Sequence, residues 1–185
     1  MGDCFETIAD VEATPEEADR LGAEVLWWLV EQGIVMAEQT DCTLGGKGHR
    51  PGPNYAAATV EPWAGLHQLG TNGLRVVTGR TVFYSMGNVQ VVCPRCGAVV
   101  VDDQDEDSWS EFSQVIKEWY AGGAGVRACK HCGEPLGLND WAWSPPFGFG
   151  YLGFEFWNWP RLDADFVAAV SDRLGHRLVR PYGKI

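Results

Sequence analysis

Two pairs of cysteines with the same spacing constrain this chain more than any other feature of its sequence. Cys93 and Cys96 stand in CPRCG, and Cys129 and Cys132 stand in CKHCG. Two thiolates separated by two residues can bind one ion from a tight turn, and two such turns complete a closed tetrahedral shell. Each pair is followed by glycine, which favours the backbone conformation that directs amide protons at the sulfurs. The spacing therefore predicts one structural metal site, with zinc as the metal.

Two other arrangements of these cysteines stay open at this point. Two disulfides would need an oxidising compartment, and an iron centre would use the same four thiolates. A closed shell leaves no free coordination position, which argues against a catalytic metal. His131, inside the second pair, is interpreted as a solvated or neighbouring side chain and not as a ligand. Cys4 and Cys42 have no partner at this spacing and are expected to be ordinary thiols.

The sequences CPRCG and CKHCG resemble the paired knuckles of zinc ribbons, which are small β-modules found in many unrelated proteins. The resemblance covers residues 91–135 and implies the ligands of a structural Zn²⁺: Cys93, Cys96, Cys129 and Cys132. The spacer departs from a minimal ribbon, because a capping box at Ser108–Glu111 and apolar residues at helical spacing predict an inserted helix. Zinc ribbons serve many functions, so the resemblance indicates a metal and not an activity.

The segments on either side of this zinc-ribbon-like module each predict a β-α-β unit. Helix boundaries are clear: Thr14 and Gly33 bound the first helix, and Asp163 and Gly175 bound the last. The strands are expected over residues 6–12, 34–36, 151–159 and 176–182. Residues 74–92 predict a meander of short strands broken at Gly79–Arg80 and Gly87–Asn88. We therefore expect an α+β fold in which residues 1–185 form a single compact domain.

The charge of the chain bears on its partners. The net charge is −11, and residues 1–41 contain eleven acidic side chains against one basic one, Arg20. Such a charge argues against nucleic-acid binding and favours a basic partner. A basic strip occurs near the C-terminus: Arg173, Arg177, Arg180 and Lys184. An acidic N-terminus and the lack of any run of eighteen apolar residues predict a cytoplasmic protein that does not enter a membrane.

Residues 44–54, rich in glycine and proline, predict a loop. Its GGKG resembles part of a phosphate-binding loop, but Asp41 and Gly48 occupy positions where that motif needs glycine and Ser or Thr. Lys47, His49 and Arg50 remain candidates for a small anion site.

No catalytic motif appears in the sequence, which favours a protein that is not an enzyme. If the chain is an enzyme with a dispersed active site, His49 and His67 are the first residues to test.

The stretch SPPFGFGYLGFEFWNWP, residues 144–160, carries seven aromatic rings. Along a strand, Leu152, Phe154 and Phe156 would point to the core. Glu155, Trp157 and Trp159 would share the opposite face and are candidates for partner binding.

The sequence therefore favours a non-catalytic, structural-zinc protein that acts by protein–protein binding, as an inhibitor, immunity protein or adaptor with a basic partner. The alternatives are an enzyme with a dispersed active site and a nucleic-acid-binding zinc-ribbon protein. Nothing in the sequence indicates the oligomeric state.

Overall fold

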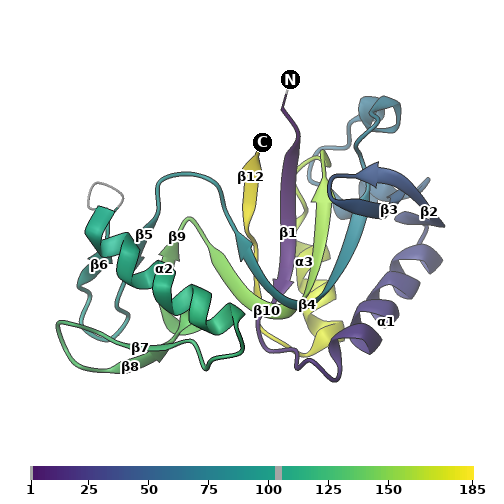
Figure 1. Cartoon of the computed structure of the whole chain (residues 1–185). Helices are drawn as coiled ribbons and strands as arrows, with labels where there is room; N and C mark the ends of the chain where they lie inside the picture. The colour runs from purple at the N-terminus through teal and green to yellow at the C-terminus, as the bar shows by residue number, and fades with distance from the viewer. Residues whose placement is uncertain (1, 103–105) are drawn as a thin grey trace.

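One antiparallel sheet, built from both ends of the chain, forms the larger part of the molecule (Figure 1). The computed structural model describes residues 2–102 and 106–185. The strand order is β11-β1-β10-β4-β3-β2, and β12 also pairs with β1. These strands are β1 (Cys4–Asp10), β2 (Val35–Thr43), β3 (Gly46–Pro51), β4 (Leu74–Tyr84), β10 (Phe147–Trp157), β11 (Leu178–Val179) and β12 (Tyr182–Lys184). The two chain ends therefore lie side by side.

Two helices, α1 (Ala18–Glu31) and α3 (Ala164–Leu174), cover one face of this sheet (Figure 1). Leu152, Phe154 and Phe156 of β10 point to this face and are at most 1% exposed, as the alternation of the strand predicts. Burial of each such side chain contributes about 1.5–3 kcal/mol. Short 3₁₀ helices close the rim of this core: η1 (Tyr55–Ala58) and η2 (Ala64–Gln68).

The predicted helix boundaries are largely confirmed, because capping depends on neighbouring residues alone. Asp163 accepts hydrogen bonds from the amides of Asp165 and Phe166, and Gly175 ends α3 with φ of 70°. Helix α1 begins at Ala18, four residues after Thr14, and the Glu17 carboxylate accepts from the Thr14 amide at 2.9 Å. The capping residues therefore form one extra turn in front of the helix.

Strand β4 runs unbroken through Gly79–Arg80, so the predicted division into two strands at this point is wrong. Its register with β10 shifts between Gly150 and Leu152, and Gly79 has φ of 95°. The dipeptide is therefore a β-bulge, which bends a strand and redirects a side chain. Arg80 points from the bulge to the end of helix α2 (Glu106–Tyr120), and its guanidinium lies 4.8 and 5.2 Å from the ring centres of Trp119 and Tyr151.

Strands β4 and β10 lead from the sheet to a second, smaller unit (Figure 1). It contains a sheet of β5 (Gln90–Val92), β6 (Val99–Val101) and β9 (Ala142–Ser144), a pair of β7 (Val126–Ala128) and β8 (Pro135–Gly137), helix α2 (Glu106–Tyr120) and η3 (Leu138–Asp140). Helix α2 lies in the spacer between the cysteine pairs, as predicted. Both units together form the predicted compact α+β domain.

Two further predictions differ from the structure. The predicted loop at residues 44–54 is mostly strand, because β3 covers Gly46–Pro51 and pairs with β2 in a hairpin whose tip lies near Leu44 and Gly45. The C-terminal strand predicted at 176–182 is divided into β11 and β12, since Pro181 cannot donate to a ladder. Among the described residues, no helix has the length and apolar character needed to cross a membrane.

Candidate metal centre and sheet cleft

The two cysteine pairs form turns with nearly the same hydrogen bonds. In the first, the Cys93 amide donates to the Ala98 carbonyl and the Gly97 amide donates to the Cys93 carbonyl, both at 2.9 Å. In the second, the Cys129 amide donates to Glu134 and the Gly133 amide donates to Cys129, both at 2.8 Å. Gly97 and Gly133 have φ of 73° and 76°, a region that favours glycine. The prediction that each cysteine pair needs glycine next to it for its backbone conformation is therefore confirmed.

The turns bring four sulfur atoms within 4.8 Å of one another. Cys93 Sγ lies 3.8 Å from Cys132 Sγ, and Cys96 Sγ lies 3.8 Å from Cys129 Sγ. Zinc–sulfur bonds of about 2.3 Å at tetrahedral angles would place the sulfurs about 3.8 Å apart. All six cysteines are free, and a disulfide needs about 2.05 Å between sulfurs. The cluster therefore fits one metal ion, and His131 is not part of it.

The thiols of this cluster do not ionise independently. Burial opposes ionisation of Cys129, but the amides of Cys132 and His131 outweigh it and lower the pKa of Cys129 to about 7. At Cys132 the Glu134 amide favours the thiolate, but burial and the neighbouring thiols outweigh it and raise the pKa to about 12. Four thiolates repel one another, and a divalent cation offsets that repulsion.

Two of the four cysteines belong to the hydrophobic core of the smaller unit, and the other two lie at the surface. Cys93 and Cys129 are at most 2% exposed and pack in that core, whereas Cys96 and Cys132 are exposed. Phe112 of α2 is fully buried in the same core, with the Arg127 guanidinium 4.5 Å from its ring centre. Each cysteine turn therefore contributes one buried side chain to this core.

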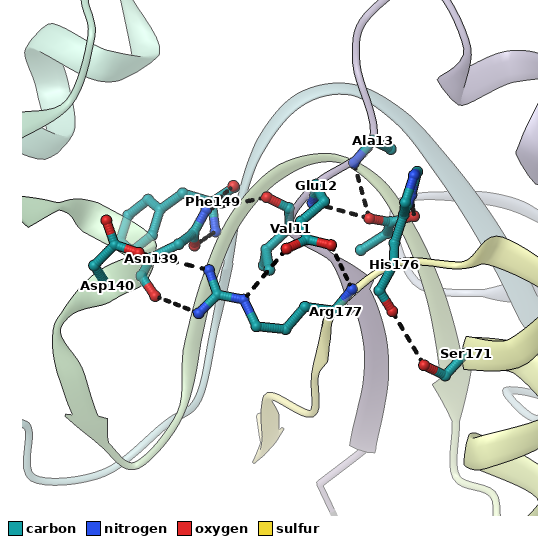
Figure 2. Close-up of polar contacts among 10 residues, drawn as sticks. Val11, Glu12, Ala13, Asn139, Asp140, Phe149, Ser171, His176 and Arg177 are labelled. Carbon is teal, nitrogen blue, oxygen red and sulfur yellow. Dashed lines mark hydrogen bonds and ion pairs between the residues drawn. The ribbon is translucent and has the colours of Figure 1, made fainter.

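A polar joint connects the smaller unit to the main sheet (Figure 2). The Arg177 amide donates to Glu12 at 2.8 Å, and its guanidinium donates to the Asn139 carbonyl at 3.1 Å. The Asn139 side chain accepts from the Phe149 amide at 2.9 Å and donates to the Phe149 carbonyl at 2.6 Å. It therefore pairs with β10 as a short strand would.

His176 lies beside this joint (Figure 2), and it contacts a buried carboxylate, that of Asp10. Asp10 is fully buried, and it accepts from the Ala13 amide at 2.9 Å and lies 2.9 Å from His176 Nδ1. This hydrogen bond with Asp10, together with nearby carboxylates, raises the pKa of His176 above its ordinary value despite partial burial. The pair therefore ties the end of β1 to the segment after α3.

The predicted partner-binding residues do not share one face. Glu155 and Trp157 lie on the face of β10 opposite to α1 and α3. Strand β10 ends at Trp157, and Asn158 turns the chain with φ of 55°, which breaks the alternation. Trp159 therefore returns to the helix-side core, where its indole donates to the Asn72 carbonyl at 3.0 Å. The prediction that these three residues share one face is therefore wrong for Trp159.

A cleft of about 360 Å³, here called the sheet cleft, lies on that opposite face. Phe5 and Trp157 form its floor with ring centres 5.4 Å apart, and Tyr84, half exposed, lies edge-on to Phe5. Arg75 and Glu155 contribute an ion pair of 2.7 Å. The remaining lining residues come from β1, β4, the β2–β3 hairpin and the C-terminus: Thr7, Leu44, Gly45, Thr81, Val82, Phe83 and Ile185.

The candidates for an anion site lie on strand β3 and point in different directions. His49 is buried, with Nδ1 bonded to the Met36 carbonyl at 2.9 Å. Arg50, on the other face, donates to the Asn72 side chain at 3.1 Å, and Lys47 is exposed. The three side chains do not converge, so an anion site here stays a prediction. His67 packs edge-on against Tyr55.

Sequence reasoning missed the sheet cleft because its residues come from strands far apart in the chain. Alternation within β10 indicated only that Glu155 and Trp157 share a face. Comparison of the chain with protein-family models, curated proteins and solved structures gives no match.

Proposed function

We propose that the four cysteines hold one Zn²⁺ that stabilises the fold and takes no part in catalysis. The support for this is the closed arrangement of four sulfurs, all within 4.8 Å of one another, in which two separations of 3.8 Å suit zinc–thiolate bonds. A bound ion would supply the positive charge that the thiolates need and would hold the two knuckles together. Binding free energies of structural zinc, about 10–16 kcal/mol in zinc-finger peptides, then add to folding.

We further propose that the protein is non-catalytic and acts by binding a basic protein. The sheet cleft carries this proposal. Three aromatic residues, Phe5, Tyr84 and Trp157, meet there beside an ion pair. Rings of this kind are favoured at the centres of protein interfaces, and a surrounding polar rim excludes water. An apolar side chain of the partner would enter the cleft.

The charge of the chain supports a basic partner. Within the cleft Arg75 and Glu155 balance each other, so the net charge of −11 acts at longer range. The electric field of this net charge raises the rate of encounter with a protein of opposite charge, and added salt weakens the field.

The Trp157 indole N–H is one of three buried side-chain polar atoms that have no hydrogen-bond partner in the described part of the chain. An unpaired buried donor costs about 1–3 kcal/mol. This atom is buried, so an acceptor of the partner would remove that cost only by displacing the side chains that cover it.

A capture experiment with two matched variants tests this function. Tyr84 and Tyr120 are both exposed, at 49% and 63%, but only Tyr84 lines the sheet cleft. We expect the wild-type chain and Tyr120→Ser to retain one stoichiometric basic protein from cytosol, which moderate salt releases. Tyr84→Ser should bind it at least tenfold more weakly.

Three results would contradict the proposal. Equal capture by the wild type and both variants would place the interface elsewhere. Co-purified RNA in place of a protein would favour the nucleic-acid alternative. An empty lane at high protein concentration would favour an enzyme or a small-ligand binder.

A further inference from the structure

The β1–β12 pair carries a second hollow, here called the cationic shelf, near the two chain ends at the top of Figure 1. Glu6 stands opposite Tyr182 in this pair, and Lys184 follows two residues later. Because side chains alternate along strands, these three share the face on which Ile8 packs in the helix-side core. The segment after β10, with Trp159 and Arg161, forms a wall of the hollow.

The charge on the shelf is opposite to that of the whole chain. Arg161, Arg180 and Lys184 line it against one carboxylate, Glu6. The Arg180 guanidinium donates to Glu6 and to the Leu162 carbonyl, which fixes its position. Arg161 and Lys184 are exposed and form no ion pair with any residue of the described ranges. The shelf therefore keeps two uncompensated positive charges in a chain of net charge −11.

The shape and the rings of the shelf suit a small molecule. The hollow has a volume of about 830 Å³, within the roughly 300–1,000 Å³ typical of ligand sites. Tyr182 is 53% exposed and lines the hollow together with Trp159, which is buried. Arginine and lysine recognise carboxylate and phosphate oxygens, and an exposed ring stacks on a flat apolar group.

We propose that the cationic shelf binds a small anionic ligand, a carboxylate or phosphate carried on a flat apolar body. Arg161 and Lys184 bind the anionic group, and Tyr182 stacks on the apolar part. This site is separate from the candidate metal centre, and of its lining residues it shares only Phe5 with the sheet cleft. It also differs from the anion site that the sequence predicts at Lys47, His49 and Arg50.

Binding of 1-anilinonaphthalene-8-sulfonate, a flat aromatic anion, tests the site by fluorescence titration. We expect saturable binding to the wild type that weakens as salt is added. The double variant Arg161→Ser/Lys184→Ser should bind at least tenfold more weakly. The matched control, Arg20→Ser/Lys117→Ser, removes one exposed arginine and one exposed lysine elsewhere and should bind as the wild type does.

A second pair of variants separates the shelf from the sheet cleft. Tyr182→Ser should weaken dye binding, whereas Tyr84→Ser should not. Equal affinity of both double variants would overturn the proposal, as would loss of binding in Tyr84→Ser with Tyr182→Ser unchanged. The changed positions are all exposed, so urea unfolding midpoints close to that of the wild type are expected.

Discussion

Removing Arg80 should weaken the connection between the main sheet and the smaller unit. Its guanidinium donates to the carbonyls of Trp119 and Gly123 at the end of α2, the latter at 3.2 Å. It also lies over the rings of Trp119 and Tyr151. A charge-assisted hydrogen bond contributes about 1.5–3 kcal/mol and a cation–π contact about 0.5–2 kcal/mol. Because Arg80 is partly exposed and these contacts are not additive, we expect Arg80→Ala to cost about 3 kcal/mol.

Urea unfolding followed by tryptophan fluorescence measures this loss. For a chain of this size, about 3 kcal/mol corresponds to a fall of about 6–12 °C in Tm. Arg80→Met keeps an unbranched apolar stem over the rings and should recover part of the loss. Arg20→Ala, at an exposed position on α1, should change stability by less than about 0.5 kcal/mol. If Arg80→Ala were as stable as Arg20→Ala, the conclusion that Arg80 connects the main sheet to the smaller unit would be refuted.

Two further predictions concern stability. Asp10 raises the pKa of His176 in the folded protein, so the stabilisation from this pair is complete below pH 6.5 and is lost as pH rises through the raised pKa. In His176→Gln the urea unfolding midpoint should not show this fall with pH. A β-carbon at Gly150 would lie 2.2 Å from the Asp10 carbonyl oxygen, so Gly150→Ala should cost about 2–3 kcal/mol. Gly70→Ala, with open space around it, is the control and should be nearly neutral in the same unfolding assay.

The features that could be predicted from the sequence are those decided by neighbouring residues. Asp163 caps the amides directly after it, and Gly175 takes the conformation that ends α3. The two cysteine turns are formed by six consecutive residues each, so their shape and the positive φ of their glycines could be predicted without the rest of the fold. The clustering of the four sulfurs could be predicted because both turns carry the same cysteine spacing.

The features that the sequence did not reveal depend on distant partners. Gly79–Arg80 has the sequence of a turn, but it forms a bulge because the flanking residues of β4 pair with β10. The Arg80 side chain then contacts Trp119 of α2. The alternation of β10 predicts that Trp159 lies on the same face as Trp157, but the turn at Asn158 places it on the opposite face. The Asn158 side chain donates hydrogen bonds to Asp3 and to the Thr71 carbonyl, which hold this turn. The sheet cleft and the cationic shelf combine residues from both chain ends, so no local pattern marks them.

Metal analysis of the purified protein tests the central claim most directly. We expect about one zinc per chain in the wild type and in Cys4→Ser, which changes an exposed free thiol outside the cluster. Cys93→Ser should lose the zinc together with much of its stability, because a serine hydroxyl is a poor ligand for Zn²⁺. Iron in place of zinc, two disulfides without metal, or the same zinc content in Cys93→Ser and Cys4→Ser would contradict a structural zinc site.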